Sequence, residues 1–127
     1  MSSNLTTVFN NHFEEFINDI QSVFPDDADI LTAKNALLTI RKANPKLLSK
    51  IWTKYVVTPY YKEIEQGNIN FFIEKDYSED ISKNENADKI MESIDRLRNP
   101  VKQMSSENQV KTMKYIQNLT KISMMIT

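Results

Sequence analysis

Cysteine is absent from this sequence, and glycine occurs only once in 127 residues. Without cysteine the chain cannot form a disulfide, a cysteine-based zinc site or a thiol nucleophile, and it suits a reducing compartment. Tight hairpins use glycine where φ is positive, and phosphate-binding loops need several glycines close together. A single glycine therefore argues against a sheet-rich fold and against a nucleotide-binding loop.

Long apolar runs are also missing, since no stretch approaches the ~20 residues that a membrane span needs. The first residues, MSSNLTTVFNNHFEEF, lack the basic region and apolar run of a signal peptide, so we expect none. The length is typical of one domain, and 40% hydrophobic residues are enough for a core. We therefore expect a single helical domain over residues 1–127, located in the cytoplasm unless it joins an assembly.

Apolar residues recur every three or four positions along most of the chain, which is the spacing of amphipathic helices. The first such segment covers about 4–24, and the second covers about 27–43. Asn44-Pro45 then predicts an immediate restart, with Asn44 as the capping residue and Pro45 as the first helical residue. One face of the following helix is apolar and should enter the core. It consists of Leu47, Leu48, Ile51, Trp52, Tyr55 and Val56.

The second half shows the same spacing with more frequent breaks. Thr58-Pro59 predicts a new short helix that ends near Gly67, where a left-handed C-terminal cap fits. Residues 68–77 are compatible with a short helix or with a buried extended piece, and we favour the helix. The stretch that follows is rich in polar residues, so we expect a loop at about 77–86.

Two further helices complete the prediction. One covers about 85–98 and is expected to break at Asn99-Pro100. The other begins with a capping box at Ser106–Gln109 and runs to about Met125. Together the segments predict an all-α fold, namely a single compact bundle of five or six helices.

Charge is segregated along the chain although the net charge is only −1. Residues 41–62 carry six bases and no acid, and residues 96–127 carry six bases and one acid. Residues 1–40 and 63–95 are acidic. These blocks could pair within the bundle, where exposed ion pairs contribute about 1 kcal/mol or less each, or they could contact partner proteins or other copies. A basic face directed at nucleic acid is a third interpretation.

The first basic block contains a ladder of lysines at four-residue spacing, which a helix places on one face. We expect Lys46, Lys50 and Lys54 to bind a partner, with Tyr60 and Tyr61 at the end of the ladder. Nucleic-acid stacking would need exposed aromatic rings beside the cations, whereas the other aromatic residues of this helix fall on its apolar face. The expected acidic counterpart consists of Glu74, Asp76, Glu79 and Asp80.

Other chemistry-bearing residues fit structural roles better than sites. His12 is the only histidine and has no metal spacing around it, so we expect a surface or interfacial side chain. The acids at Asp26, Asp27 and Asp29 lack the glycine and glutamate of a calcium loop, so we expect them to cap a helix. The remaining helical carboxylates show no acid–base arrangement. They are Glu14, Glu15, Glu63 and Glu65. We therefore expect no enzyme, no metal and no cofactor.

The C-terminal segment ends in two methionines followed by an isoleucine. Methionine adapts to irregular surfaces, so an amphipathic helix that ends in this way can bind a partner. The alternative is a last helix that packs into its own bundle. Both interpretations remain open from the sequence.

Four stretches of the chain, read together, resemble a known group of proteins. They are FEEFINDIQSVFPDDADILTAKN, IRKANPKLLSKIW, VVTPYYKEIEQGNINFFIEKDY and IDRLRNPVKQMSSENQVKTMKYIQNL. Over about residues 9–122 they are similar to small virion and uncharacterised proteins of nucleocytoplasmic large DNA viruses, including algal viruses. The resemblance implies a virion component assembled in the host cytoplasm, with a minor capsid protein as the natural role. It carries over no functional residues.

These observations lead us to expect a non-enzymatic structural or interaction protein. Its helices would contact other protein subunits, either capsid proteins or further copies of itself. The alternative is a nucleic-acid-binding or regulatory helical module that uses the basic residues of 41–62 and 96–121. In that case Arg96, Arg98 and Lys102 would extend the lysine ladder.

Overall fold

A computed structural model describes residues 2–74 and 85–126, so most of the predicted polar loop at 77–86 lies outside it. The described residues contain helices and no strand. If the continuous run from α3 to α4 is counted once, they form six helical segments, which confirms the predicted all-α bundle of five or six helices. The elements are α1 (Ser2–Val23), α2 (Ala28–Ala43), α3 (Leu47–Trp52), the π-helical turn η1 (Thr53–Val57), α4 (Thr58–Glu65), α5 (Asn70–Glu74), α6 (Glu85–Lys102) and α7 (Ser106–Met125).

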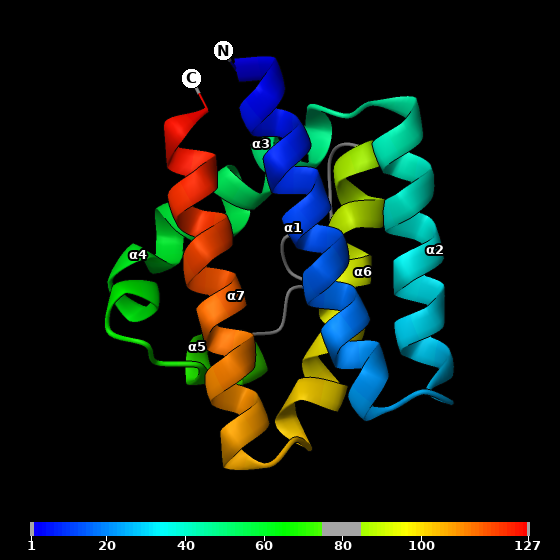
Figure 1. The fold of residues 1–127 in the computed structure, drawn as a ribbon, viewed down its shortest axis with the longest axis vertical. Coiled ribbons are helices and arrows are strands. Elements are labelled where there is room, and N and C mark those ends of the chain that lie inside the picture. Colours follow the sequence, from blue (N-terminus) through cyan, green and yellow to red (C-terminus); the bar gives the residue numbers. More distant parts are fainter. Residues whose placement is uncertain (1, 75–84, 127) are drawn as a thin grey trace.

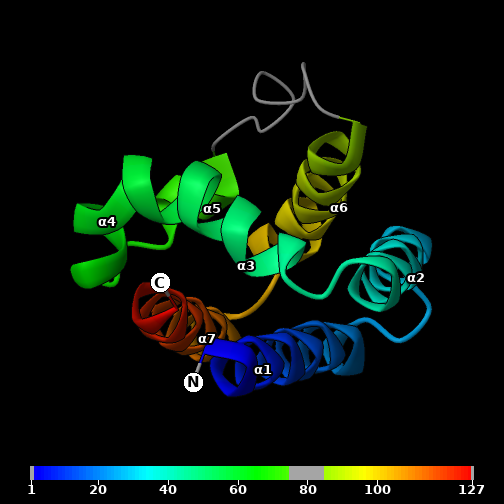
Figure 2. The same cartoon turned by 90° about the horizontal axis from the view of Figure 1, so that it is seen from above.

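The helices form two antiparallel pairs joined by a crossing segment. α1 and α7 lie side by side, so the two ends of the described chain meet at the same end of the bundle (Figure 1). α2 and α6 form the second pair. The run α3–η1–α4 crosses from the α2 side to the far side of α7 (Figure 2). No helix in the described part of the chain is both long and apolar enough to span a membrane.

Aromatic rings from α1 and α3 form the centre of the core. Trp52 is fully buried, and its ring lies edge-on to Phe13 at 5.5 Å and 89°. A second edge contact joins Trp52 to Phe9 at 6.4 Å. The predicted burial of Trp52 is thus confirmed, while Tyr55 is only partly buried. Because these contacts fix the rotation of α3 about its axis, they also decide which of its side chains face solvent.

The predicted restart at Thr58-Pro59 is wrong, because the backbone stays helical through Thr58 (φ −58, ψ −50). Pro59 has no N–H for the carbonyl oxygen of Tyr55, and the chain widens into a π turn ahead of it. The N–H and the hydroxyl of Thr58 both donate to the carbonyl oxygen of Thr53. The helix kinks after the proline, at Tyr60 (φ −124, ψ 22).

The predicted role of Asn44-Pro45 is also wrong. Asn44 ends α2, since its N–H donates to the carbonyl oxygen of Ile40 at 2.8 Å, and α3 begins only at Leu47. The carbonyl oxygen of Pro45 accepts a hydrogen bond from the amide of Asn10 in α1, at 2.9 Å. This contact from a distant helix holds the proline in a turn outside the helix.

The predicted break at Asn99-Pro100 does not occur, because α6 continues to Lys102. Pro100 and Val101 are buried, and packing therefore holds the last turn despite the missing N–H. The side-chain amide of Gln109 donates to the carbonyl oxygens of Val101 (3.2 Å) and Lys102 (3.4 Å). A residue of the next helix thus caps the end of α6.

The capping of α7 is displaced by one residue from the predicted box. Ser105 is the N-cap, and its hydroxyl oxygen accepts from the N–H of Asn108 at 3.3 Å. Gln109, which the predicted box would use at the start of α7, instead serves α6. Either of the adjacent serines, Ser105 or Ser106, could be the N-cap from the sequence alone. The contact of Gln109 with the end of α6 favours Ser105.

Gly67 confirms the predicted left-handed cap, with φ +73. Its N–H donates to Ile64 at 3.0 Å and the N–H of Asn68 donates to Glu63 at 2.9 Å, which is the Schellman pattern. The amide of Gln117 in α7 donates to the same Ile64 carbonyl at 2.9 Å. The cap therefore fixes the end of α4 to α7, and the short helix predicted beyond it is observed as α5.

Gly67→Ala is expected to lower the free energy of unfolding by about 1–2 kcal/mol, because an L side chain is strained at this φ. The added Cβ would lie 3.7 Å from Gln117, an ordinary contact, so the cost comes from the backbone. Gly67→Asn should cost about half as much, since asparagine tolerates the left-handed region. Urea unfolding followed by circular dichroism measures both variants. Equal stability of all three proteins would contradict the assigned conformation.

Candidate interaction surface

The outer face of α3 and η1 carries Lys46, Lys50 and Lys54, and all three are exposed. The opposite face is buried through residues such as Ile51 and Trp52. The predicted separation of a lysine face from an apolar face is therefore observed. From the first lysine to the third the helix rises roughly 12 Å, so the three cations form a row on a helix that the core holds in place.

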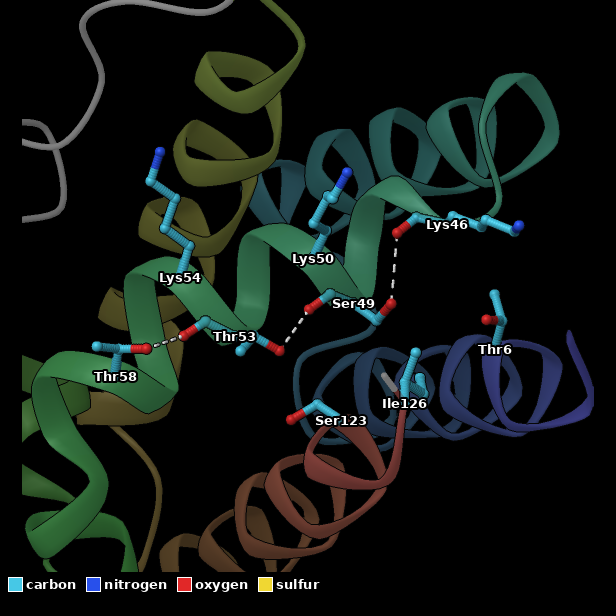
Figure 3. A pocket seen from close by; sticks show the side chains of 9 residues that line it. All are labelled: Thr6, Lys46, Ser49, Lys50, Thr53, Lys54, Thr58, Ser123 and Ile126. Atoms are coloured by element: carbon cyan, nitrogen blue, oxygen red, sulfur yellow. Dashed lines mark hydrogen bonds between the residues drawn. The ribbon is translucent and has the colours of Figure 1, made fainter. Parts of the chain in front are cut away.

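A cleft of about 500 Å³ lies beside this row, between the α3–η1 helix and the ends of α1 and α7 (Figure 3). We call it the lysine cleft. Lys46, Lys50 and Lys54 belong to its lining and form its rim. The side chains of Lys50 and Lys54 extend from the side of the helix that faces away from α7, whereas Ser49 and Thr53 lie on the side that faces it (Figure 3). The complete lining is Thr6, Lys46, Ser49, Lys50, Thr53, Lys54, Thr58, Ser123 and Ile126.

The hydroxyl groups on the wall of the cleft use their protons inside their own helices. Thr53 donates to the carbonyl oxygen of Ser49 at 2.9 Å, and Ser49 donates to that of Lys46 at 3.4 Å. Ser123 donates in the same way to Thr120, at 2.8 Å. These three hydroxyls therefore have no free proton to donate to a ligand, and Ser49 and Ser123 are themselves buried. A ligand that fits this lining carries negative charge for the rim.

Sequence reasoning missed these hydroxyl residues. A local signal existed for two of them, because Ser49 and Thr53 repeat the four-residue spacing one position before Lys50 and Lys54. Nothing local places Ser123 beside them, because it comes from the far end of the chain.

Four basic residues outside the lysine cleft pair with acids inside the fold. The pairs, with their N–O distances, are Arg41–Glu14 (2.7 Å), Arg96–Asp29 (2.8 Å), Arg98–Asp95 (3.2 Å) and Lys111–Asp19 (2.8 Å). By contrast, none of the three cleft lysines forms an ion pair with a carboxylate among the residues that the structure describes. Lys54 lies over the ring of Tyr55, 5.4 Å from its centroid. The arginines therefore form ion pairs within the fold. The lysines of the cleft lack such pairs in the described part of the chain, so their charge can interact with a partner.

The arginines proposed to extend a nucleic-acid face do not line the cleft. Arg96 also contacts Glu92 at 3.3 Å, and Arg98 donates to the carbonyl oxygen of Ile73 at 3.2 Å. Lys102 is exposed at the end of α6. With Trp52 buried as well, the described surface around the cleft has cations without the exposed indole that base stacking would use.

The two tyrosines predicted at the end of the ladder differ in their surroundings. Tyr60 stacks on Phe71 with 5.3 Å between ring centroids, so its ring packs within the fold. Tyr61 is 42% exposed. Of the predicted acidic counterpart, Glu74 ends α5 but its side chain is outside the described part of the structure. Asp76, Glu79 and Asp80 lie outside it entirely.

Tyr61 borders a second hollow of about 310 Å³, which we call the α4–α7 pocket. It is lined by Tyr61, Ile64, Glu65, Gln117, Thr120, Lys121 and Met124. The last helix packs into its own bundle, which was one of the two alternatives, and its end is exposed. It buries Ile116 and Leu119 in its own bundle and leaves Met124 and Met125 exposed.

His12 lies at the interface of α1 and α7, partly buried, as predicted. Its Nδ1 is 3.3 Å from Glu15, and its ring centroid is 5.0 Å from that of Tyr115. A hydrogen bond and the charge of Asp19 raise the pKa of Lys111, and burial raises the pKa of Tyr115. Both shifts move the pKa further from neutrality, so Lys111 is charged and Tyr115 is neutral at pH 7.

Of the three aspartates predicted to cap α2, one is observed to do so. Asp27 is the N-cap, and its carboxylate accepts from the N–H groups of Asp29 at 2.8 Å and Ile30 at 3.1 Å. Among the described side chains, no three of the His, Asp and Glu residues come together in a way that could hold a metal ion.

No protein-family model, no curated protein and no solved structure matches this chain. The resemblance to virion proteins therefore stays a prediction.

Proposed function

We propose that this chain is a non-enzymatic interaction protein that binds an acidic surface of another protein through the lysine cleft. The observation that carries the proposal is the row of three exposed lysines without an ion pair in the described fold. Scattered surface lysines are common, but these three stand on one helix whose rotation is fixed by Trp52. A fixed row of like charges favours a partner with complementary acids and sets its register.

We also propose the setting that the viral resemblance implies. The chain would be a minor capsid protein or another virion component, assembled in the host cytoplasm and in contact with capsid subunits or further copies of itself. Rim charges of this kind influence the rate and the specificity of association more than its strength. The cleft would therefore align subunits, with other contacts contributing the affinity.

Reversing the charge of the cleft is expected to weaken binding to an acidic polypeptide by about 10- to 100-fold, since three surface pairs at roughly 0.5–1 kcal/mol each are lost. The variant is Lys46→Glu/Lys50→Glu/Lys54→Glu, and the probe is fluorescent poly-L-glutamate, with binding followed by anisotropy at about 50 mM salt. The matched control, Lys62→Glu/Lys102→Glu/Lys114→Glu, makes the same charge change at exposed positions outside the cleft. It should change affinity by less than about threefold.

Two results would contradict this function. One is equal weakening by the cleft variant and the control, which would reduce the interaction to net charge. The other is tighter binding of duplex DNA than of poly-L-glutamate, with a steep loss of affinity as salt rises. That second result would support the nucleic-acid-binding alternative instead. Circular dichroism of each variant checks that the fold is retained.

A further inference from the structure

The lysine cleft and the α4–α7 pocket follow one another along the same two helices. On α4 the lining passes from Thr58 in the cleft to Tyr61 in the pocket, and on α7 it passes from Ser123 to Thr120. The step on α7 is three residues, or about one helical turn, whereas the step on α4 crosses the kink at Tyr60. Within α7 the hydroxyl of Ser123 donates to the carbonyl oxygen of Thr120, one turn earlier. The two hollows are therefore neighbours along α7, and we call them together the path.

The two parts of this path differ in chemistry. The cleft has a cationic rim, whereas the pocket has the buried Ile64 in its lining and the half-exposed side chains of Tyr61 and Met124 at its border. Methionine adapts its shape to an incoming group, and an apolar side chain that fills such a pocket is the usual anchor of a protein–protein contact. A partner that covers both parts must carry acids and a large apolar side chain.

We propose that this path binds an acidic amphipathic segment of a partner protein. The carboxylates of the segment contact Lys46, Lys50 and Lys54, and one large apolar side chain enters the α4–α7 pocket. The protons of the Ser49, Thr53 and Ser123 hydroxyls are engaged within their own helices, so these groups offer no donor to a free phosphate. This inference rests on the proposed function. To the ionic contact at the lysine cleft it adds a second, apolar contact in the α4–α7 pocket.

The test uses labelled synthetic peptides of about 16 residues, which as helices extend about 24 Å. Each carries three glutamates at four-residue spacing and one phenylalanine placed one, two or three turns beyond them. Matched peptides have alanine in place of phenylalanine. Anisotropy should show that at least one phenylalanine peptide binds the unmodified chain about tenfold more tightly than its alanine partner.

A double-mutant cycle then assigns the anchor to the pocket. Tyr61→Ala/Met124→Ala should remove the tenfold advantage of phenylalanine and leave the alanine peptide unaffected. The control Val110→Ala/Met125→Ala changes two equally exposed apolar residues that do not line the pocket, and it should preserve the advantage. All four positions are exposed, so the variants should fold.

The outcomes separate this inference from the proposed function. If phenylalanine and alanine peptides bind equally, and charge reversal of the cleft weakens both, the proposed function is supported and the second contact is overturned. If the pocket variant and its control weaken binding alike, the pocket is likewise overturned. If neither peptide binds while poly-L-glutamate does, the amphipathic segment is overturned alone. If no acidic probe binds, both proposals fall.

Discussion

Replacement of Trp52 by alanine is expected to lower the free energy of unfolding by about 3–5 kcal/mol. The side chain is fully buried and makes edge contacts with the rings of Phe9 and Phe13. Its removal therefore loses both apolar burial and packing that neighbours recover only in part. A domain of this size is stable by only about 5–15 kcal/mol in total, so the variant should lose a large share of its stability.

Trp52→Phe is the matched control, and it should cost about 1–2 kcal/mol. The indole N–H of Trp52 is buried and has no acceptor among the described residues. Its removal offsets part of the packing loss, because an unpaired buried donor is unfavourable. Urea unfolding followed by circular dichroism compares the variants without relying on tryptophan fluorescence. If both substitutions cost the same, the ring contacts described for this residue would not be what stabilises the core.

Phe72→Ala is expected to cost a similar amount, about 3–5 kcal/mol, and to act first on α5. That helix has only five residues, far too few to be stable in isolation. It is held by burial of Phe71, Phe72 and Ile73, with the Phe72 ring 6.5 Å from that of Phe16 in α1. Loss of the central ring should therefore release α5 from the bundle before the other helices unfold.

Hydrogen exchange distinguishes this local release from uniform weakening. In the Phe72→Ala variant, amides of residues 70–74 should lose protection more than those at the centre of α1. Asn70→Ala serves as the control within the same helix, since Asn70 is exposed and its substitution should change stability by no more than about 0.5 kcal/mol. Uniform loss of protection across α1 and α5 would show that α5 is not a separate unit.

Periodicity predicted the helices and their buried faces well, because burial of an apolar stripe is the main reason that they form. Trp52 and the lysine face follow from the same spacing. The predicted helix ends were wrong where the stabilising contact comes from another helix and not from a neighbour in the sequence. Gln109 caps α6 beyond Pro100, and Asn10 holds Pro45 outside α3. Local capping rules do not include such partners, because these arise only once the helices have packed.

The candidate site was likewise predictable only in part. The three lysines were predictable, because one helix carries them all. The wall opposite was not, since Thr6 and Ser123 reach the cleft only through the antiparallel pairing of α1 with α7. The internal pairing of Arg41 and Arg96 likewise depends on which helices become neighbours. The spacing in the sequence identified the row of lysines. The packing of the helices determines which basic residues form ion pairs.

The meeting of the two chain ends has a practical consequence for any binding assay. Thr6 and Ile126 both line the lysine cleft, so an affinity tag or fluorescent protein fused at either end would stand beside it. Such a fusion would compete with the partner for space, or add its own charges to the rim. A dye attached at Asn35, which is exposed on α2 and does not line the cleft, would report on binding from a distance.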